Sequence, residues 1–260
     1  MQDGTKLLCL FDPHISTIPD GKGGWKPDTA KALDTALEFG EWWKPDITLT
    51  GHDFMEFAPI SYWNRRKKVS MEGRRLVYDF EYANQVLDRI CGFTKQDVVF
   101  QPGNHDMWLN DYIEMNPELD GLITQSRILD FKGRCIQELK EQEIWRCGKA
   151  SFVHEFIRPR TYKTKYHSAR MAEDYSKSMF YGHWHTHQVF SRISWDTKPN
   201  IAVAIGCLSN LNPGWMRNVP NNFVNQVLFF EFDSRGYFSH YCPIMINGKF
   251  RFQGKLFGGK

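Results

Sequence analysis

The first half of the chain alternates short apolar runs with longer segments of helical periodicity. The apolar runs are Leu7–Phe11, Ile47–Thr50 and Val98–Gln101, each of the length expected of a buried strand. Between them, apolar residues recur every three or four positions over Pro27–Trp43 and Ser70–Cys91, which predicts two helices. Strands that alternate with helices are joined by right-handed crossovers, so the three strands are predicted to pair in parallel.

The second half of the chain is richer in strands. Apolar runs predict strands over Cys135–Leu139, Glu143–Cys147, Ala150–His154, Met179–Tyr181, Val189–Ile193, Ile201–Ile205, Val227–Phe232 and Tyr237–Tyr241. Asp233–Gly236 predicts a hairpin turn between the last two. No linker, repeat or low-complexity segment divides the chain, and 260 residues can bury a full core. We therefore expect residues 1–260 to form a single domain of the α/β (α+β) class.

Residue types that bind metals follow several of these strands. In chain order they are Asp12, His14, Asp53, Asn104 and His105 within Gly103–Asp106, His154, and His183 and His185 within Gly182–His185. Carboxylate, imidazole and amide oxygen ligands suit divalent manganese, iron or zinc. One Asp-x-His or Gly-x-His pair arises by chance in many proteins, and Asp53 by itself is equally explained as a helix or turn cap. The ordered set predicts a two-metal hydrolase centre, because two ions can hold both the attacking and the leaving oxygen of a phosphoryl displacement.

The motifs D-x-H, G-D-x-x-[DE], G-N-H-[DE], a lone His and G-H-x-H resemble those of the calcineurin-like metallophosphoesterase superfamily, over about residues 6 to 206. The resemblance implies two facing mixed β-sheets flanked by helices, with a dinuclear metal site at the strand ends. It implies that one ion is held by Asp12, His14, Asp53 and His185, and the other by Asp53, Asn104, His154 and His183, with Asp53 bridging. Manganese is the expected ion, with iron, zinc or magnesium as alternatives.

The same resemblance implies roles for two further residues. His105 is expected near the leaving group and Asp106 is expected to orient it, which makes His105 the general acid. The alternative is that His105 only positions the phosphate. The attacking group is expected to be a hydroxide that bridges the two ions, because the ions lower the pKa of the water between them.

Histidines elsewhere in the motifs need separate interpretation. His183 and His185 can point to the same side if the backbone is strand-like there, with Trp184 facing the core. His187 continues the alternation but lies beyond the family pattern, and His167 and His240 have no motif support. We expect all three of these to be core or surface histidines.

His52 departs from the family pattern because it stands where the family has the glycine of Gly-Asp. Glycine allows the backbone to turn closely under the metals, so an imidazole should either crowd that turn or add a ligand or a hydrogen bond. It could also be a substitution that weakens activity. The sequence leaves these alternatives open.

Charge, cysteines and the N-terminus add a few constraints. The net charge of +3 is mild and says little about partners. The six cysteines show no Cys-x-x-Cys spacing, which argues against a zinc ribbon or a disulfide framework and favours a reducing, cytoplasmic location. The N-terminus lacks the features of a signal peptide, and no stretch is long enough to span a membrane, so no membrane partner is expected. Oligomeric state is not indicated.

Two basic segments suggest the substrate class. One follows Asp53 and includes Arg65 and Arg66; the other follows His154 and includes Arg158 and Arg160. Aromatic residues lie among them, which suits a nucleic-acid strand, although such a charge run is often only a solvated surface. The motifs lack the G-D-x-x-D-R-G and G-N-H-E forms of Ser/Thr protein phosphatases. We therefore expect a metal-dependent phosphodiesterase acting on nucleic acid; the alternatives are a small nucleotide substrate or a non-catalytic scaffold.

Overall fold

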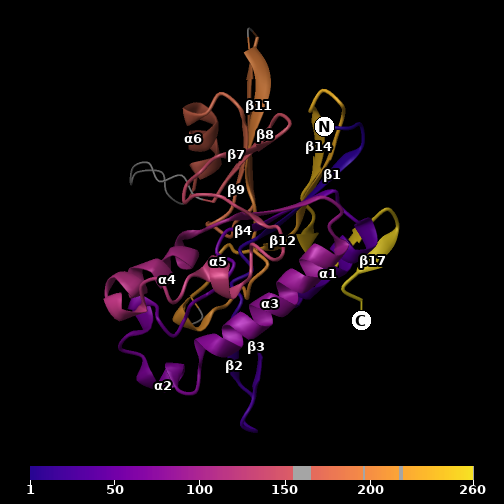
Figure 1. Ribbon diagram of the computed structural model, residues 1–260. Coiled ribbons are helices and arrows are strands. Elements are labelled where there is room, and N and C mark those ends of the chain that lie inside the picture. The colour runs from indigo at the N-terminus through magenta and orange to yellow at the C-terminus, as the bar shows by residue number, and fades with distance from the viewer. Residues whose placement is uncertain (155–164, 196, 217–218, 260) are drawn as a thin grey trace.

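The three apolar runs of the first half lie side by side in one sheet (Figure 1). The computed structural model describes residues 1–154, 165–195, 197–216 and 219–259. The strands of the first sheet, in spatial order, are β14 (Phe238–Tyr241), β13 (Leu228–Phe232), β1 (Thr5–Phe11), β4 (Ile47–Gly51), β5 (Asp97–Gln101) and β6 (Gln137–Glu138). The strands β1, β4 and β5 are parallel to one another, whereas β13 is antiparallel to β1. The predicted parallel pairing is confirmed.

The second sheet is built from the strand-rich half of the chain. Its strands, in spatial order, are β10 (Gln188–Ser194), β11 (Thr197–Ala204), β9 (Ser178–Tyr181), β8 (Ala150–Val153) and β7 (Trp145–Cys147). The strand β9 is parallel to both β8 and β11, and the outer pairs β7–β8 and β10–β11 are antiparallel. Both sheets are therefore mixed.

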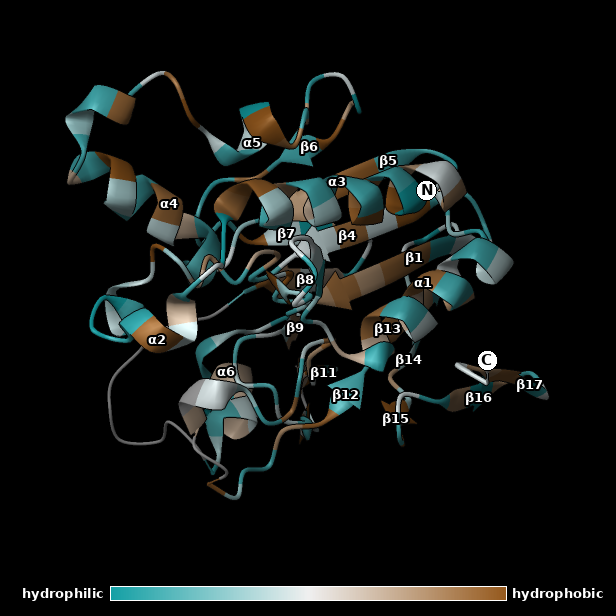
Figure 2. Ribbon diagram, turned by 90° about the horizontal axis from the view of Figure 1, so that it is seen from below, coloured by the Kyte–Doolittle hydropathy of each residue, from teal (hydrophilic) through white to brown (hydrophobic). Residues whose placement is uncertain are grey.

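The strand β1 is apolar along most of its length because both of its faces are buried. Leu7, Cys9 and Phe11 pack with apolar side chains of β8 and β9 in the core between the two sheets. Leu8 and Leu10 face the opposite way, into the cluster formed with the helices α1 (Lys31–Trp43) and α3 (Leu76–Phe93). In Figure 2, β1 is brown, whereas α1 and α3 carry both brown and teal segments.

A helix also covers the outer face of the second sheet. Met171 and Ala172 of α6 (His167–Asp174) pack with Met179 and Tyr181 of β9. The order of layers is therefore helices, sheet, sheet and helix. The expectation of two facing mixed sheets flanked by helices is confirmed.

The remaining elements are short and lie in the connections. They are β2 (Thr17–Pro19), β3 (Trp25–Pro27), η1 (Tyr62–Asn64), α2 (Lys68–Met71), α4 (Asn104–Glu114), η2 (Pro117–Leu119), α5 (Gln125–Ile128), η3 (Gly214–Met216), β12 (Asn225–Gln226), β15 (Ile244–Met245), β16 (Phe250–Phe252) and β17 (Lys255–Phe257). None of the helices in the described part of the chain is both long and apolar enough to cross a membrane.

Two predicted helix starts are wrong, and each has a local cause. The first helix begins at Lys31 because Trp25–Pro27 pairs with β2 as a hairpin. The second begins at Leu76 because Gly73, with a φ of 73°, interrupts the chain after the short α2. The predicted turn at Asp233 is confirmed, since the amide of Gly236 donates to the Asp233 carbonyl at 3.0 Å.

Asp79 ties α3 to the hairpin strand β2. Its Oδ1 accepts hydrogen bonds of 2.7 Å from both the backbone amide and the hydroxyl of Thr17. Burial raises the pKa of Asp79 to about 6, because the hydrogen bonds from Thr17 offset only part of the cost of desolvating the charge.

The substitution Asp79→Asn should stabilise the fold above pH 6. In the unfolded chain an aspartate ionises near pH 4, so between about pH 4 and pH 6 the unfolded state loses its proton before the folded state does. The native state is then disfavoured by up to about 3 kcal/mol at pH 7, and not at all below about pH 4. Asparagine keeps the acceptor for Thr17 and removes the ionisation. Urea unfolding should show a gain at pH 7 that disappears at pH 4; an equal gain at both would contradict this account.

Candidate metal centre

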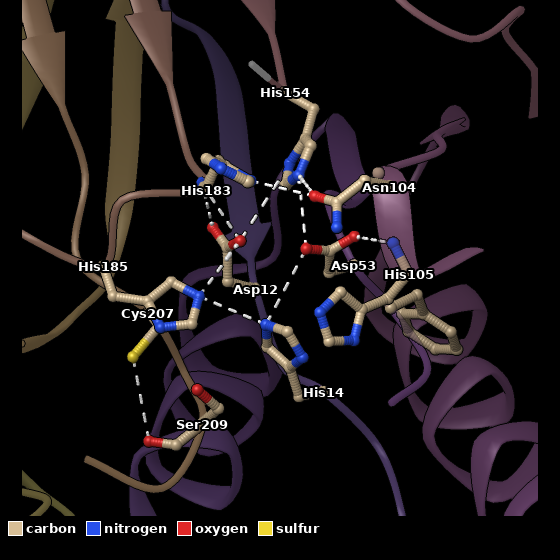
Figure 3. Close-up of polar contacts among 12 residues, drawn as sticks. Asp12, His14, Asp53, Asn104, His105, His154, His183, His185, Cys207 and Ser209 are labelled. Carbon is tan, nitrogen blue, oxygen red and sulfur yellow. Dashed lines mark hydrogen bonds and ion pairs between the residues drawn. The ribbon is translucent and has the colours of Figure 1, made fainter. Parts of the chain in front are cut away.

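Five strand ends bring the candidate ligands to one place, where the two sheets meet (Figure 3). The ligands follow the carboxyl ends of β1, β4, β5, β8 and β9, and each has a side-chain atom within 4.0 Å of another. They are Asp12, His14, Asp53, Asn104, His154, His183 and His185. The structure therefore brings together all seven residues that the motifs predict.

The first predicted ligand set converges around His14 and His185. The Nε2 atoms of these two rings are 3.1 Å apart, and the Nε2 of His185 is 3.5 Å from Oδ1 of Asp12. The Nε2 of His14 is 3.9 Å from Oδ2 of Asp53. Asp12, His14 and His185 thus form one group whose donor atoms lie within 4.8 Å of one another, and Asp53 joins it through its contact with His14.

The second set converges around Asn104 and His154. The Nε2 of His154 is 3.2 Å from Oδ2 of Asp53 and 3.1 Å from Oδ1 of Asn104. The Nδ1 of His183 is 2.9 Å from the same Asn104 oxygen. His183 thus uses the ring nitrogen opposite to the one that the other three histidines use.

These distances fit two divalent cations. Metal–nitrogen and metal–oxygen bonds of about 2.0–2.2 Å place neighbouring ligand atoms about 3–3.5 Å apart. Asp53 belongs to both sets through one atom, because its Oδ2 faces His14 on one side and His154 on the other. Its Oδ1 accepts a 2.6 Å hydrogen bond from the backbone amide of His105, which fixes the orientation of the carboxylate. The donor set therefore suits a shared, bridging carboxylate.

The backbone at the site is left-handed at six residues that are not glycine. Their φ angles are 51° at Asp12, 46° at His14, 50° at His52, 63° at Asp53, 69° at His183 and 57° at His185. This conformation costs on the order of 1 kcal/mol at each residue, so the rest of the fold must enforce it. The expected strand-like backbone at His183 and His185 is therefore wrong. Two tight turns, and not strand alternation, aim both rings at the site.

Asp106 does not orient His105, which corrects the role expected for it. Its carboxylate accepts hydrogen bonds from the backbone amides of Phe54, Met55 and Gly103, and from the side chain of Gln125. Burial and the nearby charge of Asp53 raise the pKa of Asp106. Asp106 instead ties the loop after β4 to the loop after β5, because it lies at the start of α4 and faces inward.

Glu56 performs the contact that was expected of Asp106. Its Oε2 lies 2.6 Å from Nδ1 of His14 and 3.2 Å from Nδ1 of His105. Burial alone would raise the pKa of Glu56, but hydrogen bonds from His105 and His14 outweigh it and lower the pKa to about 2. Glu56 is the last residue of the G-D-x-x-[DE] motif, and that position is the sequence signal that could have identified it.

The ring of His105 lies beside the ligands and faces the cavity. It stacks on Trp108 with ring centroids 3.7 Å apart. Burial opposes its protonation, but the carboxylates of Asp53 and Glu56 outweigh burial and raise the pKa of His105 to about 9. His105 is therefore held as a proton donor in the metal-free protein. Cations bound at Asp53 would weaken that effect.

A cavity of about 600 Å³ opens in front of the ligands. His14, Asp53, His105, His183 and His185 line one side, and the rest of the lining includes Ser16, Asp28, Glu56, Asn64, Lys67, Ser70, Met71, Arg74, Ser209, Asn210 and Phe223. Its lysine and arginine residues are Lys67 and Arg74, which belong to the basic segment after Asp53 but were not among the predicted substrate-binding residues.

The predicted substrate-binding arginines are placed differently. Arg65 and Arg66 are exposed and do not line the cavity, since the chain turns there so that only Lys67 and Arg74 of this basic segment reach it. Arg158 and Arg160 lie outside the described residues.

The other histidines take structural positions. His167 is buried, hydrogen-bonded to Tyr181 and Thr186, and stacked on Trp184. His187 contacts the side chain of Gln226, and His240 packs among phenylalanine rings. None of these three belongs to a candidate metal group in the described part of the chain. The same is true of His52.

The sequence and the structure of this chain were compared with those of known proteins. No family model matches the sequence, and no curated protein matches it. The chain is similar to the crystal structure of Vps29 from Chaetomium thermophilum, with 9% identity over 92% of this chain and 97% of that chain. The TM-score of this match is 0.39. The chain itself shows two mixed sheets and, at their strand ends, clustered acid and imidazole groups that could hold metal ions.

Replacing Asp53 with Ala should remove both ions, because the shared oxygen contributes to both ligand sets. Replacing His185 with Ala should remove only the ion of the first set. The control His187→Ala, two residues after His185 in the chain, should keep the metal content of the wild type. Elemental analysis of the purified variants measures these contents. An unchanged content in Asp53→Ala would exclude the bridging role.

Proposed function

We propose that the protein is a dinuclear metal-dependent phosphoesterase. The observation that carries this proposal is the position of Asp53 Oδ2 between two complete sets of ligands, one around His14 and His185 and the other around His154 and Asn104. When bound, two divalent ions supply an activated water and neutralise the charge of the phosphate. A single structural ion would not need this duplicated ligand set.

The protein's own residues provide access for the substrate and a proton donor for the leaving group. The open cavity gives a phosphoester access to the ligands, and His105 lies on its wall. Glu56 contacts the His105 ring at Nδ1, 3.2 Å from its Oε2, so Nε2 is the nitrogen that remains for a substrate. A histidine held in this way can donate a proton to a leaving oxygen. A non-catalytic scaffold would have no use for this second acid beside the ligands.

The finer proposal is that the substrate is a phosphodiester within a nucleic-acid strand. Lys67 on the cavity wall has only a neutral partner among the described residues, the Oδ1 of Asn64 at 3.1 Å. In the same loop, Tyr62 and Trp63 are 68% and 69% exposed, and Arg65 lies over one face of the Tyr62 ring, so both rings can stack on bases at the surface. The size of the cavity supports a small nucleotide as the second candidate, since 600 Å³ is within the range of small-molecule sites.

The substitution His105→Asn should keep both ions and slow turnover by about a hundredfold or more, the typical effect of removing a positioned general acid. The defect should be smaller for a good leaving group. Hydrolysis of bis-p-nitrophenyl phosphate with added manganese, compared with that of an alkyl ester, measures the difference. If the two esters are slowed equally, His105 does not protonate the leaving oxygen. If the wild type hydrolyses neither, the scaffold interpretation is correct.

The nucleic-acid proposal predicts that Lys67→Gln weakens oligonucleotide cleavage by about tenfold or more, because a charged hydrogen bond contributes about 1.5–3 kcal/mol. The neighbouring exposed Lys68→Gln is the matched control and should have little effect.

For single-stranded oligonucleotide and the His105→Asn protein, the logarithm of the binding constant should fall linearly with the logarithm of the salt concentration. The slope should fall by about 0.7 when the Lys67 charge is removed. Equal slopes for the two lysine variants, or no salt dependence in the parent, would favour the small nucleotide.

A further inference from the structure

His52 occupies a buried position directly behind the candidate ligands. It follows β4 with a φ of 50°, and its side chain has no exposed surface. The ring stacks on Phe11 of β1, with centroids 3.6 Å apart and an angle of 13° between the planes. The stack fixes the ring in one orientation. His52 therefore neither points into the cavity nor disrupts the turn that places Asp53.

The ring of His52 lies beside ligands of both sets. It meets the ring of His154 edge to face, with centroids 5.4 Å apart. On another side it approaches Asp12 and Gly182: a Cβ built on Gly182 would lie 3.2 Å from His52 Nδ1 and 2.3 Å from Asp12 Oδ2. His52 is thus packed between Asp12 of the first set and His154 of the second.

Several buried polar atoms at these strand ends have no hydrogen-bond partner within 3.5 Å among the described residues. Those around His52 are its own Nδ1 and Nε2, Nδ1 of His154 and Oε1 of Gln101, and the Gln101 side chain is near enough to the His52 ring to favour its protonated form. Gln101 is close to both histidines: its carbonyl accepts from the amide of His52 at 2.7 Å, and its Nε2 donates to the carbonyl of Phe152, two residues before His154. Buried polar groups rarely lack partners, and several at one site indicate an ordered water.

We propose that His52 is a positioning residue of the metal centre, and that together with Gln101 it holds one internal water against Nδ1 of His154. Every hydrogen bond of this water then has one donor and one acceptor. With Nε2 of His154 on the ligand side, its Nδ1 carries the proton and donates to the water. The water donates to Oε1 of Gln101 and to the unprotonated nitrogen of His52. The other nitrogen of His52, Nδ1, lies on the side of Asp12 and Gly182.

This arrangement gives a physical reason for an imidazole where the family motif has glycine. Outer hydrogen bonds fix the tautomer and the ring orientation of a ligating histidine, and their loss typically weakens metal affinity by about 10- to 100-fold. His14 has such a partner in Glu56, at 2.6 Å. His52 and its water provide the equivalent for His154. The inference rests on the proposed function only in that His154 binds an ion.

The test compares His52→Phe with His52→Gln. Phenylalanine keeps the stack on Phe11 but removes both ring nitrogens, so the affinity for the ion of the second set should fall by about 10- to 100-fold. The ion of the first set should be affected much less. Glutamine restores a donor and an acceptor and should recover most of the affinity. His240→Phe, which removes a histidine remote from the ligands, is the matched control.

Manganese titration calorimetry of the metal-free proteins gives the two affinities, and thermal melting shows whether each variant is folded. Equal second-ion affinity in the wild type and in His52→Phe would overturn the role of His52, and so would a failure of His52→Gln to recover affinity. A wild type that binds no ion would instead contradict the proposed function itself.

A high-resolution crystal structure of the wild type provides a measurement that does not depend on how the variants fold. It should show a water within about 3 Å of Nδ1 of His154 and of a His52 nitrogen. Contacts made by another group at those atoms would overturn the proposal.

Discussion

The carboxylate of Asp53 is the constraint on which the site depends. One oxygen is fixed by the backbone amide of His105, so the other is held between the two ligand sets. That amide belongs to the first turn of α4, whose position is set in turn by Asp106 and the loop after β4. The separation of the two candidate ion sites is therefore determined by backbone geometry, and not by a flexible side chain.

Buried carboxylates and left-handed backbone both cost free energy, and both occur around the candidate ligands. Asp12 and Asp53 are buried, and six nearby residues have left-handed backbone. Desolvation alone would favour the neutral acids, yet the imidazoles that face them keep the pKa of both carboxylates low. Close backbone packing contributes as well, because a Cβ on Gly103 would lie 2.2 Å from Asp53 Oδ1. Such features persist when a packed core on both sides of the sheet enforces them.

Two acidic residues next to the ligands, Asp106 and Glu56, have different roles. Asp106 accepts three backbone amides and shapes the loops, whereas Glu56 contacts the rings of His14 and His105. The distance of each residue from His105 along the chain does not predict which role it has. Asp106 directly follows His105 in the chain, but the start of α4 turns its side chain inward. Glu56 is far from His105 in sequence and close to it in space.

The alternation of β1, α1, β4, α3 and β5, the parallel pairing of these three strands and the identity of the candidate ligands could all be predicted from the sequence. Local periodicity and residue chemistry are sufficient for them, because a buried strand must be apolar and a ligand must have a donor atom. Tertiary structure alone decided that Glu56 contacts His105, that Lys67 and not Arg65 lines the cavity, and that His52 stacks on Phe11. Each of these depends on the path of a loop between strands, and loop paths follow from long-range packing that a local pattern does not encode.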